Sequence, residues 1–366
     1  MTVNMFDLFS KADYDAARAE GLIAVREDGR GLFIHNYSDA ALYTEGAWSN
    51  PAIRGCRGLI TTEAGEVIAR PWVKFFNHGQ AEAGELDMSA PVEVTDKMDG
   101  SLGIIHRALD GSIRVATRGS FQSEQAEHGT RVLDERYASW LDGLTEVTPL
   151  VEIIYPGNRI VCDYGDTDDL VLLGGVVIET GDYLGPRETA QAVDWPGPIV
   201  RTFPYATLKD ALEAEPRDGA EGLCVRYLHE PRVVKVKQDD YVRLHRIVTG
   251  LSERTVWEHM TEGKPLEDLL GPLPDELHNW TREVWGRLHG EAVSLRQAAE
   301  AAHVRIVNAL EAGWTRAHYA ELAKTHGPLA PWLFNLLDGR DPHDRILRTL
   351  KPAGDTRAKT YSEATA

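Results

Sequence analysis

The stretch Lys97-Met98-Asp99-Gly100-Ser101-Leu102-Gly103 decides how the rest of this chain is interpreted. Residues 92–95 before it and 102–105 after it have the apolar patterns of strands. Because Asp-Gly is a strong hairpin signal, one interpretation is a hairpin turn with an incidental lysine. The other is a lysine held at a fixed bend between two buried strands. The remaining sequence has to distinguish them.

The composition is that of a folded protein of 366 residues, 43% of them hydrophobic and 26% charged. That length predicts two domains. The formal net charge of −18 argues against a large basic surface that binds nucleic acid electrostatically. Any nucleic-acid role therefore needs a localised basic pocket, or a site where Mg²⁺ supplies the positive charge.

Membrane and secretory segments are not expected, because no apolar run is long enough and the N-terminus lacks the pattern of a signal peptide. Three dispersed cysteines without a Cys-x-x-Cys pair argue against disulfides and zinc, and favour the cytoplasm. Thirteen histidines form no His-Glu-x-x-His motif, and no P-loop is present. A zinc enzyme and a P-loop ATPase are therefore not expected.

Strand patterns dominate the first two thirds of the chain. We expect strands at residues 31–35, 57–62, 66–70, 92–95, 102–105, 112–117, 150–155, 170–178, 222–227 and 232–237, and helices at 10–18 and about 122–141. From about residue 241 the hydrophobic period becomes helical. Apolar residues then step by threes and fours, at Leu288, Ala292, Leu295, Ala299, Ala302, Ile306 and Leu310. The predicted fold class is α+β, with a β-rich domain at 1–248, an all-helical domain at 249–351 and a polar tail at 352–366.

Several charged residues interrupt these patterns. Glu152 stands in an apolar strand, and Glu221 opens another just before a glycine. Lys235 and Lys237 lie two apart, so a strand places both ammonium groups on one face. Each has an ordinary explanation alone: an exposed strand carboxylate, a solvated turn residue or lysines that protect an edge strand.

Together these residues form an ordered set. It runs as Arg57, Lys74, Lys97 in Lys-x-Asp-Gly-Ser, Arg118 in Thr-Arg-Gly-Ser, Glu152, Glu221 in Glu-Gly, and Lys235 and Lys237 in Lys-x-Lys. The first motif alone arises by chance in roughly one chain per several hundred of this length. The later motifs in the same order favour the reactive lysine over the incidental one.

This order resembles the covalent nucleotidyltransferase superfamily of polynucleotide ligases and mRNA capping enzymes. Within it, residues 57–60 and 70–77 resemble the ATP-dependent RNA ligases of the bacteriophage tRNA-repair type, the RNA ligase 1 type. The resemblance covers most of residues 50–245. It implies that residues 1–248 form an adenylyltransferase domain of ATP-grasp-like antiparallel sheets with flanking helices. The helical domain would then contribute to RNA or tRNA specificity.

The resemblance implies an enzyme that seals 5′-phosphate and 3′-hydroxyl RNA ends through lysyl–AMP and RNA–adenylate intermediates. Lys97 would be the lysine that receives AMP. Because a free lysine is almost wholly protonated, we expect the cations Lys235 and Lys237 and bound Mg²⁺ to lower its pKa. Glu221 would bind Mg²⁺ through water, and Glu152 would hold the ribose or assist the metal. The implied cofactors are ATP and Mg²⁺, with Mn²⁺ as a substitute.

The remaining cations would contact phosphates by the same resemblance. Lys235 and Lys237 would contact the α-phosphate and the leaving phosphates, and Arg57 and Lys74 the β- and γ-phosphates. Arg118 stands where the family more often has lysine, and would contact phosphate or the RNA end. The residues after Glu152 also depart from the superfamily pattern, since 172–178 offer no aromatic ring to stack on adenine.

Two alternatives stay open. A DNA ligase or a capping enzyme has similar motifs but is usually followed by a β-barrel module. A catalytically silent RNA-binding protein would have lost the lysine, a glutamate or the Lys-x-Lys pair. Under the leading hypothesis the partners are RNA ends, including broken tRNA, and an end-healing kinase–phosphatase. The expected location is the cytoplasm of a bacterial or phage-infected cell, without membrane association.

Overall fold

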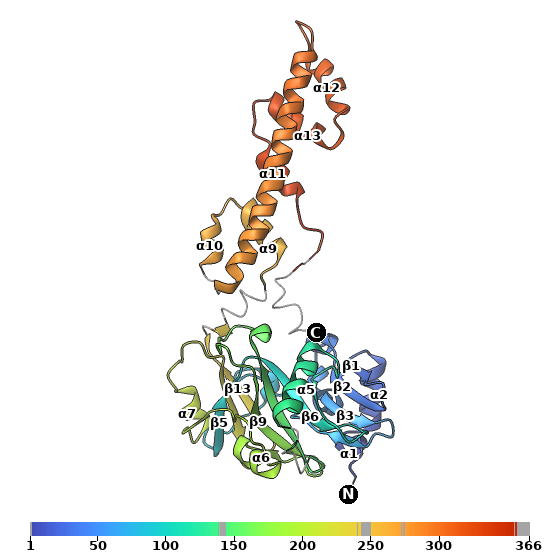
Figure 1. The fold of residues 1–366 in the computed structure, drawn as a ribbon, viewed down its shortest axis with the longest axis vertical. Coiled ribbons are helices and arrows are strands. Elements are labelled where there is room, and N and C mark those ends of the chain that lie inside the picture. Colours follow the sequence, from blue (N-terminus) through green and yellow to red (C-terminus); the bar gives the residue numbers. More distant parts are fainter. Residues whose placement is uncertain are drawn as a thin grey trace. The chain divides into compact units, whose positions relative to one another are not determined.

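The computed structural model describes residues 2–137, 139, 144–239, 241–242, 250–271, 273, 275–354 and 356. The chain divides near residue 243 into two compact units (Figure 1). The first unit is rich in strands and the second is helical, so the mixed fold with antiparallel sheets and a helical C-terminal region is confirmed. The expected boundary at 248 and most of the polar tail lie outside the described residues.

The described strands of the N-terminal unit form antiparallel sheets. The first sheet has the order β1-β2-β3-β4 and contains β1 (Ile23–Glu27), β2 (Leu32–Tyr37), β3 (Arg57–Thr62) and β4 (Val67–Ala69). The second has the order β10-β9-β8-β6-β7 and contains β6 (Ser101–Arg107), β7 (Ile113–Thr117), β8 (Val147–Ile154), β9 (Asp169–Val177) and β10 (Tyr183–Leu184). The third has the order β11-β5-β12-β13 and contains β5 (Val92–Asp96), β11 (Thr202–Phe203), β12 (Gly222–Tyr227) and β13 (Val233–Lys237).

Short helices flank these sheets. They are α1 (Met5–Leu8), α2 (Lys11–Ala19), α3 (Asp39–Tyr43), α4 (Pro51–Gly55), α5 (Glu124–Arg136), α6 (Pro186–Ala192) and α7 (Leu208–Leu212). Ser10 caps α2 by accepting a hydrogen bond from the Asp13 amide at 3.1 Å, as the expected helix start at Ser10 requires. The helix α5 covers one face of the second sheet, where Leu133 packs with Val151 and Ile153 (Figure 1).

The hairpin interpretation of residues 97–100 is wrong. β5 pairs with β11 and β12 in the third sheet, whereas β6 pairs with β7 and β8 in the second. The segment between them is therefore a crossover from one sheet to the other, and the Asp-Gly signal is overridden by strand partners far along the chain. The bend between two buried strands, which was the other interpretation, is confirmed.

The strand β8 is buried along its whole length because both faces of the second sheet are covered. Leu150 packs with Ile34 and Ile60 of the first sheet, while Val151 packs beneath α5. Glu152, which follows Val151, is only 8% exposed. The interpretation of Glu152 as an ordinary solvent-exposed carboxylate is therefore wrong, and a buried carboxylate requires partners.

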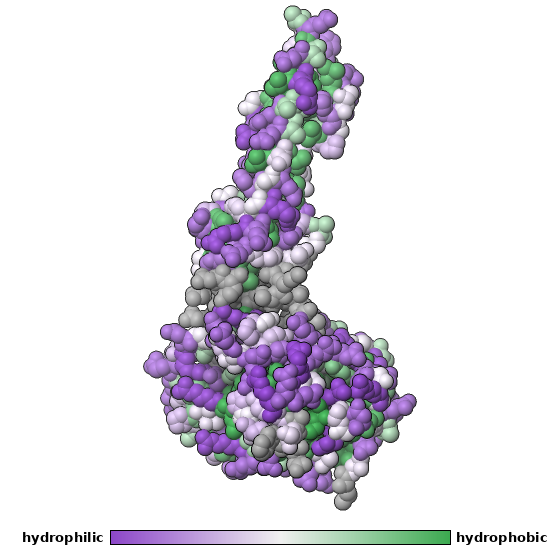
Figure 2. Space-filling view, in the orientation of Figure 1, coloured by the Kyte–Doolittle hydropathy of each residue, from purple (hydrophilic) through white to green (hydrophobic). Residues whose placement is uncertain are grey.

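The C-terminal unit is organised along one long helix. Its described helices are α9 (Glu253–Thr261), α10 (Leu266–Leu270), α11 (Asp275–Ala309), α12 (Arg316–Lys324), α13 (Ala330–Leu337) and α14 (His343–Thr349). Leu288, Ala292, Ala299, Ala302 and Ile306 of the predicted stripe on α11 are buried, so the helical period was interpreted correctly. Within the described residues, no helix combines the length and the apolar character that a bilayer span needs. The face of the N-terminal unit in Figure 2 is mainly hydrophilic, with small hydrophobic patches.

Two buried histidines are expected to make stability depend on pH. Burial lowers the pKa of His35 and His106 to about 4, from an ordinary 6.5. The unfolded chain takes up these protons below pH 6.5, whereas the folded chain takes them up only near pH 4. The free energy of unfolding should therefore fall as pH falls from 6.5 to 4, by up to about 3 kcal/mol per histidine.

Urea unfolding of the parent and of His106→Gln at pH 7, 5 and 4 measures this dependence. The variant should show a smaller loss of stability between pH 7 and pH 4 than the parent. The exposed His229 supplies the control, and His229→Gln should keep the slope of the parent. An equal slope in all three proteins would show that His106 is not a source of the pH dependence.

Candidate active site

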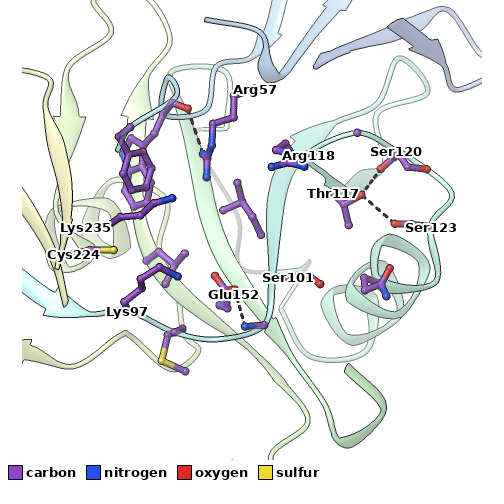
Figure 3. A pocket seen from close by; sticks show the side chains of 18 of the residues that line it. Arg57, Lys97, Ser101, Thr117, Arg118, Ser120, Ser123, Glu152, Cys224 and Lys235 are labelled. Atoms are coloured by element: carbon purple, nitrogen blue, oxygen red, sulfur yellow. Dashed lines mark hydrogen bonds between the residues drawn. The ribbon is translucent and has the colours of Figure 1, made fainter. Parts of the chain in front are cut away.

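A cavity of about 540 Å³ in the N-terminal unit is lined by residues from all three sheets and from α5. Five predicted site residues line it: Arg57, Lys97, Arg118, Glu152 and Lys235. Figure 3 shows that Lys97 and Lys235 lie on one side, that Arg118, Thr117, Ser120 and Ser123 lie on the other, and that Glu152 lies between. The crossover and the strand register thus bring together residues far apart in the sequence.

Backbone hydrogen bonds fix Lys97 at the end of β5. Its amide donates to the carbonyl oxygen of Gly222 at 3.0 Å. Arg217 donates to the same carbonyl at 2.8 Å and also holds the carboxylate of Asp96 through two hydrogen bonds of 2.8 and 3.1 Å. A bidentate arginine–carboxylate contact is directional, so it fixes the chain just before Lys97.

Asp99 anchors the crossover to a distant loop. One carboxylate oxygen accepts hydrogen bonds from the amides of Val161 and Cys162, both at 2.8 Å. The other accepts from the hydroxyl of Tyr241 at 2.7 Å, and the side chain is only 3% exposed. Asp99 therefore ties the bend to the segment after Asn158.

Gly100 is required because the crossover passes against β8. A Cβ atom there would lie 2.7 Å from the carbonyl oxygen of Ile153, and the backbone cannot give way. The close approach lets the Gly100 amide donate to Glu152 Oε1 at 3.0 Å. Burial, reinforced by the charges of Glu221 and Asp99, raises the pKa of Glu152 to about 8, although Lys97 opposes the shift.

Glu221 joins the two lysines of the site. Its Oε2 lies 2.5 Å from Lys97 Nζ and its Oε1 lies 2.9 Å from Lys237 Nζ, with the carboxylate 3% exposed. The following residue, Gly222, has a φ of +149°, and a side chain there would collide with the carbonyl oxygen of Val236. The Glu-Gly motif therefore has a steric reason, because only glycine lets the strand carry Glu221 to this position.

The pKa of Lys97 does not follow the expectation from its neighbouring cations. Burial lowers it, but the carboxylates of Glu221 and Glu152 outweigh burial and raise the pKa above its ordinary value. The neighbouring lysines alone therefore do not produce the expected lowering, because an ion pair with Glu221 favours the ammonium form. The contribution of bound Mg²⁺ to that expectation stays a prediction. Lys235 is the lysine whose pKa lies well below its usual range, through burial and the nearby cations Arg57 and Lys97.

Phe75 lies between two cations of the cavity. The Arg57 guanidinium is 5.0 Å and the Lys235 ammonium 4.7 Å from the centre of its ring. Both distances are within the range of cation–π attraction. Phe75 and Leu173 line the cavity, so its aromatic surface comes from the segment after β4 and not from β9, where the sequence shows no aromatic residue.

Lys74 is not among the residues that line the cavity. Its Nζ lies 5.2 Å from the ring centres of Tyr37 and Trp48 and 5.5 Å from that of Phe76. The Tyr37 hydroxyl accepts a hydrogen bond from Arg118 at 2.7 Å and a longer one from Lys74 at 3.5 Å. Burial raises the pKa of Tyr37, but the three cations around it outweigh burial and lower the pKa. Sequence reasoning missed Tyr37, because a tyrosine in a strand carries no local signal for this contact.

Replacing Tyr37 with phenylalanine is expected to reduce turnover without unfolding the protein. The variant removes the oxygen that holds Arg118 in the cavity, and a hydrogen bond to a charged group stabilises by about 1.5–3 kcal/mol. We expect the lysyl–AMP formation that the resemblance implies to slow by about tenfold or more. Tyr43 is 87% exposed, so Tyr43→Phe is the matched control. Equal rates for both variants would rule out a positioning role for Tyr37.

The donor set suits a magnesium ion that keeps most of its water. Within the described ranges, no group of three or more histidine, cysteine, aspartate or glutamate side chains could enclose a metal. Mg²⁺ needs only one or two carboxylates together with phosphate oxygens and water. Glu152 and Glu221 offer those carboxylates beside the cavity. Both oxygens of Glu221 already face lysines, which favours contact with the metal through water.

Comparisons with known proteins bear on the family of this chain. A family model described as RNA ligase matches residues 55–241, just over half of the chain. The protein RNA ligase 1 of bacteriophage TS2126 is 31% identical over 312 residues, which cover 77% of this chain and 74% of that protein. A Thermovibrio ammonificans protein, named as a candidate RNA ligase, is 28% identical over 218 residues, and the match spans only 56% of its length.

Solved structures of a Naegleria gruberi RNA ligase are also similar to this chain. One of them, a variant with AMP and Mn, is 20% identical, with a TM-score of 0.37. The match covers 43% of this chain and 53% of that chain. The family match and the phage relative confirm what the ordered motifs predicted: the chain belongs to the RNA ligase family.

Proposed function

We propose that this chain is an ATP-dependent RNA ligase that joins 5′-phosphate and 3′-hydroxyl ends through lysyl–AMP and RNA–adenylate intermediates. The observation that carries the proposal is the position of Lys97. Its ammonium group is paired with a buried carboxylate at 2.5 Å and lines a cavity that Arg57 and Lys235 share. Membership of the RNA ligase family supports the same activity.

In the first step, Lys97 Nζ attacks the α-phosphorus of ATP. A nitrogen–phosphorus bond forms, the bond from the α-phosphorus to the bridging oxygen breaks, and pyrophosphate leaves. The ammonium group must first lose a proton, and Glu221 Oε2 is positioned at 2.5 Å to accept it. Lys235 and Arg57, both lining the cavity, would stabilise negative charge on the phosphates as the bond forms.

The other predicted residues act around this step. Glu221 and Glu152 would hold Mg²⁺, which supplies further positive charge beside the phosphates. Lys237, 2.9 Å from Glu221, would keep that carboxylate in place and contact the phosphates. Lys74 would act on the β- and γ-phosphates through Tyr37 and Arg118, because its own ammonium group is enclosed by aromatic rings.

The helical unit is proposed to select the RNA. We infer an adenylyltransferase domain over residues 1–248 with ATP-grasp-like sheets, a specificity domain over 249–351, and a tail beyond. Of the arginines on α11, Arg287 pairs with Glu253 at 2.7 Å and Arg296 with Asp341 at 3.2 Å. Arg282 and Arg305 are exposed and have no ion pair among the described residues, which favours them as contacts to RNA phosphates.

Broken tRNA is the proposed natural substrate, with a separate kinase–phosphatase that prepares its ends. We propose that the protein acts in the cytoplasm of a bacterial or phage-infected cell. The three cysteines Cys56, Cys162 and Cys224 are free thiols, which is typical of proteins in a reducing compartment. The substrate and partner rest on the family resemblance and stay predictions.

Labelling with ATP tests the proposed function directly. The full chain is incubated with ATP labelled at the α-phosphate and Mg²⁺, and label on the polypeptide is measured after denaturation. We expect stable labelling, and transfer of the label to RNA that bears a 5′-phosphate. Joining is then compared on single-stranded RNA, on a tRNA cut in its anticodon loop and on nicked DNA.

Each alternative function has a distinct outcome in these assays. Preferred joining of nicked DNA would favour a DNA ligase, although residues 250–354 contain helices and no strand where they are described. Labelling by GTP in place of ATP would favour a capping enzyme. RNA binding with no label under any metal condition would favour a silent binding protein, although Lys97, both glutamates and the Lys-x-Lys pair are all present.

A further inference from the structure

The side of the cavity opposite Lys97 is formed by polar residues that the first step does not use. We call Arg26, Ser120, Gln122, Ser123 and Gln125 the polar wall, all of which line the cavity. Figure 3 shows Ser120 and Ser123 across the cavity from Lys97 and Lys235. These residues come from β1, from the segment that leads into α5 and, for Gln125, from the first turn of α5 itself.

Gln125 is the unusual member of this wall. Its side chain is 7% exposed, and among the described residues its amide group has no hydrogen-bond partner. Its amide nitrogen and oxygen are open to the cavity and so remain available to a ligand. Since Gln125 lines the cavity, a ligand there would supply the missing partner.

The backbone at the start of α5 adds a second set of donors. Ser123 caps this 13-residue helix by accepting from the Ala126 amide at 3.2 Å, and its carbonyl accepts from the Glu127 amide at 2.9 Å. The amide of Gln125 itself has no acceptor in the described part of the chain. Free amides at a helix N-terminus together with the helix dipole attract anions, phosphate groups in particular.

The charges of the polar wall also favour an anion. Arg26 is exposed, lines the cavity and forms no ion pair with any described residue. Arg118, held by the Tyr37 hydroxyl at 2.7 Å, lies beside the wall. Glu124 also lines the cavity, but it is exposed, so solvent screens its charge. Together these features would hold a phosphate group.

We propose that the polar wall binds the terminal phosphate of a 5′-phosphorylated RNA strand while AMP leaves Lys97, an inference that rests on the proposed function. The phosphates of ATP and of RNA share one chemistry, but two observations favour RNA. Arg57 and Lys235 both lie over the Phe75 ring, and the proposed function already assigns them to the phosphates of ATP. Arg26 is exposed, as a contact to a strand that continues out of the cavity should be, whereas ATP needs no such contact.

The second step transfers AMP from Lys97 to an RNA phosphate that lies at the polar wall. One of its oxygens attacks the phosphorus of lysyl–AMP from the side opposite Lys97, and a phosphorus–oxygen bond forms. The nitrogen–phosphorus bond breaks, its electron pair returns to Lys97 Nζ, and the amine takes up a proton from solvent. The polar wall would thus position the attacking group, while Lys97 is the leaving group.

Two substitutions separate this step from the first. Gln125→Glu keeps the size of the side chain and places a negative charge where the phosphate should bind. Arg26→Gln removes an exposed charge and so leaves the fold intact even if the buried variant is unstable. The exposed residues Gln191 and Arg187 on α6 supply matched controls, Gln191→Glu and Arg187→Gln.

Three assays on the full chain distinguish the sources of phosphate. The first measures labelling of the protein by ATP. The second mixes purified, labelled protein with RNA ends and measures label transfer to strands that carry a 5′-phosphate or a 5′-hydroxyl, with the RNA concentration varied. The third measures joining of a strand that was adenylylated chemically beforehand. Thermal unfolding of every variant reports on the fold.

We expect both variants to label with ATP within about twofold of the parent, and to need about tenfold or more RNA for half-maximal transfer. The control variants should match the parent in every assay. A loss of labelling by ATP equal to the loss of transfer would assign the wall to the phosphates of ATP and overturn the proposal. Transfer unchanged in the folded Arg26 variant would overturn it as well. Failure of the parent to label would instead contradict the proposed function.

Discussion

Replacing Lys97 with alanine is expected to abolish labelling of the protein by ATP, by a factor of at least about 10³. The reason is that no other lysine in the described part of the chain combines burial, a carboxylate partner and a place in the cavity. Lys235 lines the same cavity but forms no ion pair with a carboxylate of the described residues, and Lys237 contacts the other oxygen of Glu221. The measurement is label retained on the denatured polypeptide after incubation with ATP and Mg²⁺.

The alanine variant should stay folded. Glu221 keeps its contact with Lys237 at 2.9 Å, so the substitution leaves no buried carboxylate without a partner. Lys97→Arg should also fail to label, since a guanidinium is not a nucleophile at neutral pH. Lys209, on α7 and exposed, supplies the control Lys209→Ala, which should label like the parent. Labelling of Lys97→Ala at the level of the parent would show that the proposed function is wrong.

The strands could be predicted because they follow local sequence patterns. The reactive residues of the site could be predicted because they stand in motifs that occur in a fixed order. Period-two patterns identified β6, β8, β12 and β13 to within a few residues, since each strand has at least one covered face. The ordered motifs named Lys97, Glu221 and Lys235, which the fold brings to one cavity or beside it. What these residues do chemically follows from their types and not from their exact positions.

The errors share one physical cause, which is contact between segments far apart in the chain. The sequence Asp99-Gly100 was compatible with a hairpin, because the residues of the turn do not reveal that β5 pairs with β12 and β6 with β8. The ion pair with Glu221 reverses the expected shift in the pKa of Lys97. Tyr37 and Gln125 carry no motif, and each acquires a role only through what the fold places next to it.

Replacing Asp99 with alanine is expected to lower the free energy of unfolding by about 3–5 kcal/mol. The substitution removes the acceptor of the Val161 and Cys162 amides, both at 2.8 Å, and of the Tyr241 hydroxyl at 2.7 Å. Because the carboxylate is 3% exposed, water cannot readily replace it. Asp99→Asn keeps one carbonyl oxygen and should lose less. Denaturant unfolding of the two variants measures the difference.

In the Asp99 variants, both activity and stability should fall. In the Lys97 variants, by contrast, activity should be lost while the protein stays folded. The crossover that carries Lys97 is held at one end by Arg217 on Asp96 and at the other by Asp99, so loosening Asp99 frees the lysine from its pair with Glu221. Labelling measured at a temperature where Asp99→Asn is fully folded should still be reduced, by about tenfold. The exposed Asp134 on α5 gives the control Asp134→Ala, expected to match the parent. If Asp99→Ala unfolds at the same denaturant concentration as Asp134→Ala, the carboxylate does not hold the crossover. If Asp99→Ala unfolds at a lower concentration but folded Asp99→Asn labels like the parent, Asp99 contributes to stability alone.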